Sequence, residues 1–168
     1  RISKSKNIEE SIEGFLNSSA SESSSISIIG GPLTNEDKKY YEYLLNLYKD
    51  YKNISFIGPV PHSELANYLK NVSFHINNTD KGFYDKSVLE TSINGIINFY
   101  KNIDYDKNIP IEYQEALKFD GSSSDLSNKI SSVFTLNQNE FLKIIEHSQE
   151  EIKNESLDTL VDRIERVI

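Results

Sequence analysis

Two patterns of hydrophobic and polar positions alternate along the chain. In some blocks, such as residues 8–16, apolar side chains recur every three or four positions, and this spacing predicts amphipathic helices. Between these blocks lie short apolar runs bounded by Gly, Pro, Asn or Ser, which are typical of buried strands. Helices are expected at residues 8–16, 35–51, 64–69, 87–94, 125–134, 138–154 and 157–168. Strands are expected at residues 25–29, 54–57, 72–77, 96–100 and 116–119. Loops are expected at the serine-rich segments 18–25 and 121–124, and residues 101–115 have no clear period.

This alternation of strands and helices indicates a parallel sheet that is covered by helices on both faces. We therefore expect residues 1–168 to form a single Rossmann-like three-layer α/β/α domain with a mainly parallel sheet. In such a sheet ligands bind beyond the carboxyl ends of the strands. The first candidates for a site are therefore the residues before Ile8 and the segments 30–32, 58–61 and 77–86.

The composition excludes several classes of protein. The 168 residues include no Cys, which rules out disulfides, thiolate metal sites and cysteine nucleophiles and fits a reducing, cytoplasmic location. A formal net charge of −8 argues against a nucleic-acid partner held through its phosphates. No apolar run approaches the roughly 20 residues that cross a bilayer, so no membrane span is expected. Because the first residue is Arg1 and not Met, we expect a processed chain or a piece of a larger protein.

The densest group of positive charges in this acidic chain is Arg1, Lys4 and Lys6, directly before the helix at 8–16. Cations at the amino end of a helix favour an anion, since the helix dipole and the free N–H groups add to their field. A solvated, frayed terminus would explain the same residues. Composition alone leaves both interpretations open.

A second candidate is the stretch 80–90, which leads into the helix at 87–94. Gly82 supplies a flexible backbone position, and Asp85 is suited to cap the helix. The N–H groups of Ser87 and Val88 would then face a ligand phosphate. Glu90 lies about one turn further on, where its carboxylate could accept hydrogen bonds from two vicinal hydroxyls. An ordinary exposed glutamate on a helix is the alternative.

The glycine turns and the histidines exclude several kinds of site. Gly30 and Gly31 follow a strand, but the full G-x-G-x-x-G pattern of dinucleotide-binding proteins is absent, as is the G-x-x-x-x-G-K-[ST] loop of P-loop NTPases. The three histidines are His62, His75 and His147, and none has a second ligand at metal-binding spacing. We predict no metal site and expect His75 to lie in the core or to line a pocket.

Taken in order, the motifs resemble the C-terminal half of retaining GT-B glycosyltransferases of the group 1, family four type. Residues 1–7 are similar to the family's Arg-Leu-x-x-x-Lys-Gly element, and 28–32 are similar to its strand ending in Gly-x-Gly-Pro. Residues 53–58 are similar to an Asn-Val-x-Phe-x-Gly strand, and 85–90 are similar to the signature Asp-Lys-x-Val-Leu-Glu. The similarity spans nearly the whole chain.

The resemblance implies a domain that binds a nucleotide-sugar donor without a metal or another cofactor. It implies that Arg1 and Lys6 neutralise the diphosphate leaving group and that Glu90 holds the ribose hydroxyls, and these are the predicted catalytic residues. Gly82 stands where the family usually has a second glutamate, so Asp80 and Asp85 are the candidates to replace it. The predicted donor-binding residues are Gly30, Gly31, Gly58, Pro59, Gly82, Phe83, Asp85, Lys86, Ser87, Val88 and Leu89.

The resemblance also implies that the chain is about half of a two-domain enzyme, whose N-terminal acceptor domain is absent from this sequence. The expected activity of that parent is transfer of a sugar to an acceptor glycan or lipid-linked saccharide. The isolated chain is expected to be inactive, and any contact with the inner face of the membrane would come through the other domain. Two alternatives stay open: a non-catalytic scaffold or regulatory module in polysaccharide assembly, and a flavodoxin-like domain that binds flavin mononucleotide.

Overall fold

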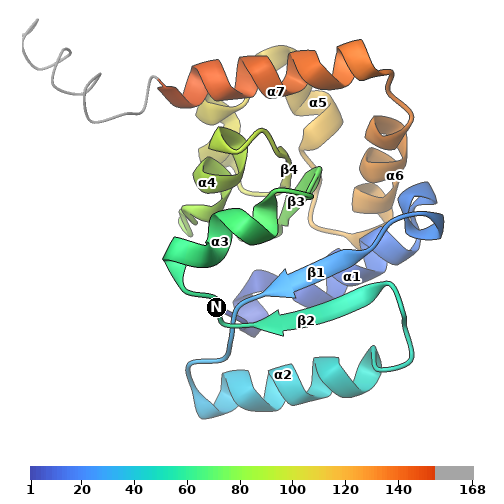
Figure 1. Cartoon of the computed structure of the whole chain (residues 1–168), viewed down its shortest axis with the longest axis vertical. Coiled ribbons are helices and arrows are strands. Elements are labelled where there is room, and N and C mark those ends of the chain that lie inside the picture. Colours follow the sequence, from blue (N-terminus) through green and yellow to red (C-terminus); the bar gives the residue numbers. More distant parts are fainter. Residues whose placement is uncertain (154–168) are drawn as a thin grey trace, which may run out of the picture.

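A computed structural model describes residues 1–153, in which strands and helices alternate as the sequence pattern predicts (Figure 1). The strands are β1 (Ile26–Ile29), β2 (Ile54–Gly58), β3 (Phe74–Asn77) and β4 (Ile97–Tyr100). The helices are α1 (Ile8–Leu16), α2 (Asn35–Leu47), α3 (His62–Leu69), α4 (Ser87–Ile93), α5 (Ile111–Leu117), α6 (Ser123–Phe134) and α7 (Gln138–Lys153). Short 3-10 helices are η1 (Lys4–Lys6), η2 (Ser19–Glu22) and η3 (Ile103–Asn108).

The strands form two parallel pairs and not one continuous sheet. β1 pairs with β2, with Ile26 opposite Ile54, and β3 pairs with β4, with Phe74 opposite Ile97. In the view of Figure 1, α1 lies behind β1 and α3 lies above it. The expected α/β/α class with parallel strands is therefore confirmed, but in the described residues the sheet is divided between β1 and β3.

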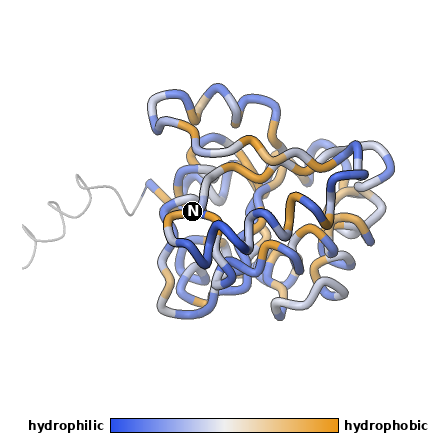
Figure 2. Tube along the Cα trace, turned by 90° about the horizontal axis from the view of Figure 1, so that it is seen from below, coloured by the Kyte–Doolittle hydropathy of each residue, from blue (hydrophilic) through white to orange (hydrophobic). Residues whose placement is uncertain are grey.

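Each half of the divided sheet has its own hydrophobic cluster. The β1–β2 half is built around Leu44 of α2 and Ile12 of α1, and the β3–β4 half around Phe99 of β4 and Leu126 of α6. Hydrophobic residues accordingly lie along the strands in the middle of the trace, while the outer helical turns are mixed or polar (Figure 2). Helix α1 joins the halves, because Ile12 belongs to the first cluster and Phe15 to the second.

Local capping explains where two of the longer helices begin. At the start of α2, Asp37 donates its N–H to Thr34 Oγ1 and its side chain accepts the N–H of Thr34, a reciprocal capping box. At the start of α6, the Ser122 side chain accepts the N–H of Asp125. Both polar residues satisfy N–H groups that would otherwise lack partners in the first helical turn.

The predictions fail mainly in the segment 101–119. The expected strand at 116–119 is wrong, since Ala116 and Leu117 end helix α5 and only one bridge, between Lys118 and Tyr100, joins the sheet. Leu117 is buried as the last residue of helix α5, which begins after Pro110. The apolar run at 116–119 is too short for its pattern to distinguish a strand from a helical turn. Helix α2 also ends at Leu47, four residues earlier than expected. The helix predicted at 157–168 lies outside the described residues.

The contact between α1 and α6 gives a prediction for stability. A Cβ atom at Gly14 would lie 2.6 Å from Leu126 Cδ2 and 3.0 Å from its Cβ. Gly14→Ala should therefore lower the free energy of unfolding by about 1–3 kcal/mol, even though Ala is the better helix former. Urea unfolding measures the change, and Glu10→Ala on the exposed side of α1 is the matched control. A Gly14→Ala protein as stable as the parent would contradict this packing.

Candidate functional site

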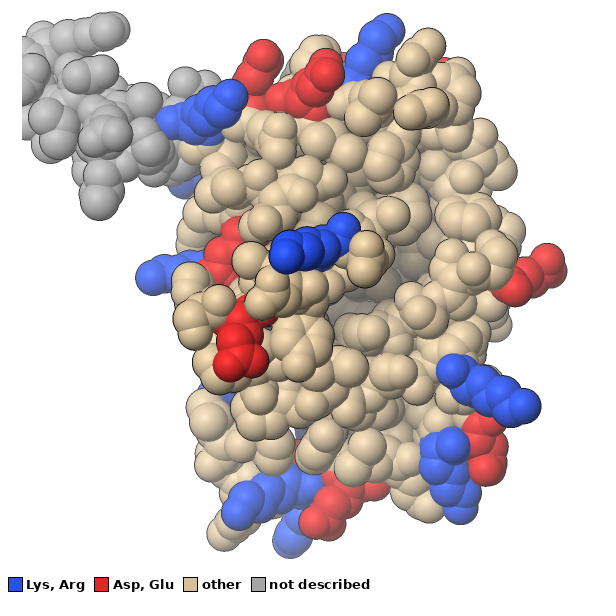
Figure 3. Space-filling model, in the orientation of Figure 1, with Lys and Arg blue, Asp and Glu red and all other residues tan. Residues whose placement is uncertain are grey.

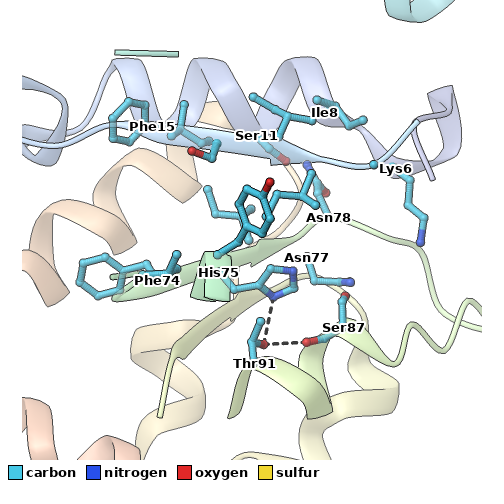
Figure 4. Close-up of a pocket in the computed structure, with 18 of the residues that line it drawn as sticks. Lys6, Ile8, Ser11, Phe15, Phe74, His75, Asn77, Asn78, Ser87 and Thr91 are labelled. Carbon is cyan, nitrogen blue, oxygen red and sulfur yellow. Dashed lines mark hydrogen bonds between the residues drawn. The ribbon is translucent and has the colours of Figure 1, made fainter. Parts of the chain in front are cut away.

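A cavity of about 1320 Å³ separates β1 from β3. Side chains of α1 and α3 line it, together with the residues of both strands. It is visible as a hollow in the face shown in Figure 3, where the surface around the opening carries few charged side chains. Figure 4 shows Lys6, Ile8 and Ser11 on one side of it and His75, Ser87 and Thr91 on the other.

The structure brings many of the predicted site residues together at this cavity and leaves others outside it. Those that line it come from the amino-terminal segment, from the turns after β1 and β2, or from the start of α4: Arg1, Lys6, Gly30, Gly31, Pro59, Asp85, Ser87 and Glu90. Those that do not line it are Gly58, Gly82, Phe83, Lys86, Val88 and Leu89. Of this second group, Val88 is fully buried in the core and Phe83 is 55% exposed.

Arg1 is held by a carboxylate of the β1–β2 half. Its Nε donates to Asp37 Oδ2 at 3.1 Å, and a second guanidinium nitrogen lies 3.1 Å from the same oxygen. Burial raises the pKa of Asp37, but hydrogen bonds from backbone N–H groups and from Arg1 outweigh it, so the net shift is downward. The sequence pattern gave no sign of this partner, because Asp37 is 36 residues away along the chain.

Lys6 is held by a carboxylate of the other half. Its Nζ forms an ion pair with Asp85 Oδ2, and Asp85 Oδ1 accepts the N–H of Ser87 at 3.1 Å. Asp85 thus accepts the first N–H of α4, but the N-cap residue is Lys86, whose side chain makes no capping bond, so the predicted capping is met only in part. The expectation that the N–H groups of Ser87 and Val88 face a ligand is wrong, because the first bonds to the Asp85 carboxylate and the second to the Asp85 carbonyl at 3.4 Å. Burial raises the pKa of Asp85, but the bonds from Lys6 and Ser87 outweigh it and lower the pKa below its usual range.

Glu90 lies one turn into α4 and reaches the cavity with a partly exposed carboxylate. Its Oε1 lies 3.3 Å from His62 Nε2, at the start of α3. The imidazole of His62 is 84% exposed, so this contact is open to solvent and easily exchanged. Glu90 therefore remains available to another hydrogen-bond donor at the cavity.

The two candidate replacements for the family's second glutamate occupy different environments. Asp85 lines the cavity beside Lys6. Asp80 does not line it, and its carboxylate pairs with Lys101 at 2.6 Å on the exposed side of the loop. Of the two, Asp85 is the one whose position fits a role at the site.

Gly30 is the glycine whose conformation matters most to the geometry of the cavity. Its φ is +135°, and a Cβ atom there would lie 3.2 Å from the backbone nitrogen of Arg1. Directly after it, Gly31 accepts the N–H of Ile2 at 2.9 Å. A side chain at Gly30 would strain the turn and displace Arg1 from the end of β1.

Two buried polar residues under the site, Asn98 and Thr91, were missed by sequence reasoning. His75 does line the cavity, as expected, and its Nδ1 lies 2.6 Å from Asn98 Oδ1. Thr91 Oγ1 bonds to the same amide oxygen and to the Ser87 carbonyl, at 2.7 Å in each case. Figure 4 shows the second of these bonds. Burial lowers the pKa of His75, which keeps its ring neutral. The only available signal was polar residues inside apolar strands.

Tyr105 is another supporting residue that was missed, in a segment without a clear period. Its hydroxyl donates to the Asp85 carbonyl at 3.0 Å and accepts the N–H of the same residue. Burial raises the pKa of Tyr105 to about 12, so the hydroxyl stays protonated and can hold both contacts. It fixes the backbone that places Asp85 opposite Lys6.

Within residues 1–153 no group of three or more His, Cys, Asp or Glu side chains is arranged to hold a metal ion. None of the helices described over the same range is both long and apolar enough to cross a membrane. The candidate site in these residues consists of two cations, two carboxylates and an apolar interior.

Comparison with known structures supports the fold. The chain is similar to the catalytic domain of cholesterol-α-glucosyltransferase from Helicobacter pylori, with a TM-score of 0.72 and 18% identity over 92% of this chain and 93% of that one. It is also similar to sucrose-phosphate synthase from Thermosynechococcus elongatus, with a TM-score of 0.74 and 14% identity over 99% of this chain and 43% of that one. No protein-family model and no curated protein sequence matches the chain. These likenesses confirm the Rossmann-like α/β fold that both structures share.

The ion pair at Asp85 gives a prediction for stability against pH. The pKa of Asp85 is lower in the folded protein than in the unfolded chain, where it is about 3.9. The ionised carboxylate therefore stabilises the folded protein at pH values above about 3.9, and this stabilisation is lost as the pH falls through the folded-state pKa. Asp85→Asn should lower the free energy of unfolding by about 1–3 kcal/mol at pH 7. The loss of stability between about pH 5 and the acid limit should also become smaller.

Urea unfolding at several pH values measures both effects. Asp80→Asn is the matched control, since Asp80 lies nearby in sequence, also pairs with a lysine and is 62% exposed. It should change stability by less than about 1 kcal/mol. Equal effects of the two substitutions would show that the Lys6–Asp85 pair has no special contribution.

Proposed function

We propose that this chain is the donor-binding domain of a glycosyltransferase, and that it binds the diphosphate of a nucleotide sugar at the cavity between β1 and β3. The observation that carries the proposal is the convergence of Arg1, Lys6 and Glu90 at one opening. They come from the amino terminus and from α4, and they meet at the carboxyl ends of β1 and β3. This is the position at which sheets of this class bind ligands.

The two cations suit a diphosphate because each is already positioned by the protein. Asp37 holds Arg1 at one side of the opening and Asp85 holds Lys6 at the other. A guanidinium that uses Nε and one Nη nitrogen for a carboxylate keeps further N–H groups for a phosphate oxygen. Fixed positive groups of this kind stabilise the negative charge that develops on a departing diphosphate.

The remaining parts of the site suit the rest of a nucleotide. The contact between Glu90 and His62 is exposed, so a ligand can displace it. The Glu90 carboxylate could then accept hydrogen bonds from two vicinal ribose hydroxyls. The turn at Gly30 and Gly31 lines the cavity together with Pro59 and would form one wall of the pocket for the base. No metal ion or other cofactor enters this proposal.

The proposed reaction is transfer of a sugar, with retention, to an acceptor glycan or lipid-linked saccharide. The family resemblance and the similar structures support it, one of which is named a glucosyltransferase. The proposed parent has a second, N-terminal domain that carries most of the acceptor site, and it works in the cytoplasm.

Binding of nucleoside diphosphates tests the donor site directly. Calorimetry with uridine, guanosine and adenosine diphosphates should detect binding to the unmodified chain, and the tightest ligand is then used for the variants. Lys6→Ala and Glu90→Gln should each weaken it by about 1–3 kcal/mol, because each removes one charged contact. Lys4→Ala is the matched control, since Lys4 belongs to the same basic group but does not line the cavity.

Three results would contradict the assignment. Binding that Lys4→Ala weakens as much as Lys6→Ala would indicate non-specific attraction to the basic terminus. Failure of all the diphosphates to bind would favour the scaffold module. Yellow protein that binds flavin mononucleotide in their place would favour the flavodoxin-like alternative.

A further prediction concerns activity. The chain should transfer no sugar from a nucleotide-sugar donor, because the acceptor side of the proposed enzyme lies on the other domain. Product analysis by mass spectrometry, with glycan and lipid-linked acceptors and with water alone, measures this. Detectable sugar transfer by the 168-residue chain would contradict the proposal that the acceptor site lies on the other domain.

A further inference from the structure

The edges of β1 and β3 that border the cavity have no strand partner. Within residues 1–153, β1 is hydrogen-bonded only to β2, and β3 only to β4. All four residues of each of these strands line the cavity, so the two free edges face each other across it. Free edges inside a protein leave N–H and C=O groups without partners, which costs free energy unless a strand covers them.

The backbone groups that face the cavity follow from the existing pairing. Ile26 and Gly30 donate their N–H groups to Asn53 and Gly58, on the β2 side. Because these groups alternate in direction along a strand, those of Ser27 and Ile29 are directed to the opposite edge. On β3, Ser73 and Asn77 accept N–H groups from the β4 side, which leaves the backbone groups of Phe74 and Ile76 directed toward the cavity.

The strands β1 and β3, to which the two free edges belong, also run in the same direction. The carboxyl end of β1 is joined to the amino-terminal segment by the bond from Ile2 N–H to the Gly31 carbonyl at 2.9 Å. The carboxyl end of β3 is joined to the same segment by the bond from Asn7 Nδ2 to the Asn78 carbonyl at 2.8 Å. At the opposite end, Ile26 and Phe74 pack against one hydrophobic cluster. A strand between them would therefore be parallel to both.

The walls of the cavity determine the chemistry of such a strand. On one side lie Ile12 and Phe15 of α1, and on the other lie Leu65 and Leu69 of α3. A strand in the middle would direct alternate side chains toward these two apolar layers. Parallel strands that are buried on both faces have nearly continuous runs of Val, Ile and Leu.

We propose that the interior of the cavity is the position of a central parallel β-strand, supplied by about five apolar residues joined directly to Arg1 in the parent polypeptide. Such a strand would end at the carboxyl edge of the sheet, where Arg1 lies 3.2 Å from the Cβ position of Gly30. Helix α1 would then connect it to the neighbouring parallel strand β1, as a crossover connection does. The added strand would complete one sheet in the order β2, β1, added strand, β3, β4.

The occupied interior is distinct from the opening at which the donor is proposed to bind, so the inference does not depend on the proposed function. A strand would fill the region beside Phe15 and Phe74 and leave Lys6 and Ser87 at the carboxyl end (Figure 4). Completion of the sheet would also fix the separation of the two halves that hold Arg1 and Lys6.

Hydrogen exchange measured by NMR tests the proposal. The chain is extended before Arg1 by Val-Ile-Val-Ile-Val, and the amide exchange of Ser27, Ile29, Phe74 and Ile76 is compared with that of the unextended chain. Exchange at all four positions should slow by at least about tenfold, because both free edges gain partners. The matched control is the extension Val-Pro-Val-Pro-Val, which is also apolar but lacks alternate N–H donors and should give no protection.

Unchanged exchange with the first extension, or equal protection by both extensions, would overturn the proposal. If the extended chain precipitates, the Val-Ile-Val-Ile-Val peptide with a lysine tail is added to the folded, unextended chain. Protection of the same four amides is again the supporting result, and its absence contradicts the strand. Ser11→Phe places a ring in the cavity and should abolish the protection, whereas Glu10→Ala, on the exposed side of α1, should preserve it.

Discussion

The amino-terminal segment, residues 1–16, holds the two halves of the molecule together. Its backbone bonds to the end of β1 through Ile2, and its Asn7 side chain bonds to the chain just after β3. Helix α1 then contributes Ile12 to one hydrophobic cluster and Phe15 to the other. Because no strand pairing connects β1 to β3 in the described residues, these contacts set the distance across the cavity.

The chemistry of the candidate site depends on the same segment. Arg1 is paired with Asp37 in the β1–β2 half, and Lys6 is paired with Asp85 in the β3–β4 half. An anion that contacts both cations would therefore bridge the halves. This couples ligand binding to the packing of α1, since a change in either would alter the separation of the two charges. The buried bonds of Tyr105 to the backbone of Asp85 serve to keep one of these partners in place.

Much of the local structure could be predicted, and the failures have definite causes. Helix α1 and the positions of β1 to β4 agree with the periodicity, because long periodic blocks and short apolar runs are strong signals. The strand expected at 116–119 is the end of α5, because a short apolar run does not distinguish a strand from a buried helical turn. The division of the sheet was not predicted, since strand neighbours are separated by dozens of residues.

The sequence by itself determined the class of fold, and it indicated the turns, cations and carboxylates that are proposed to form a site. Only the tertiary structure decided which of them meet. It placed Arg1, Lys6 and Glu90 at one opening, left Phe83 and Lys86 away from it, and supplied Asp37 and His62 as partners. The physical reason is that motifs record local spacing along the chain, whereas charge pairing and burial depend on distances between segments that only packing brings together.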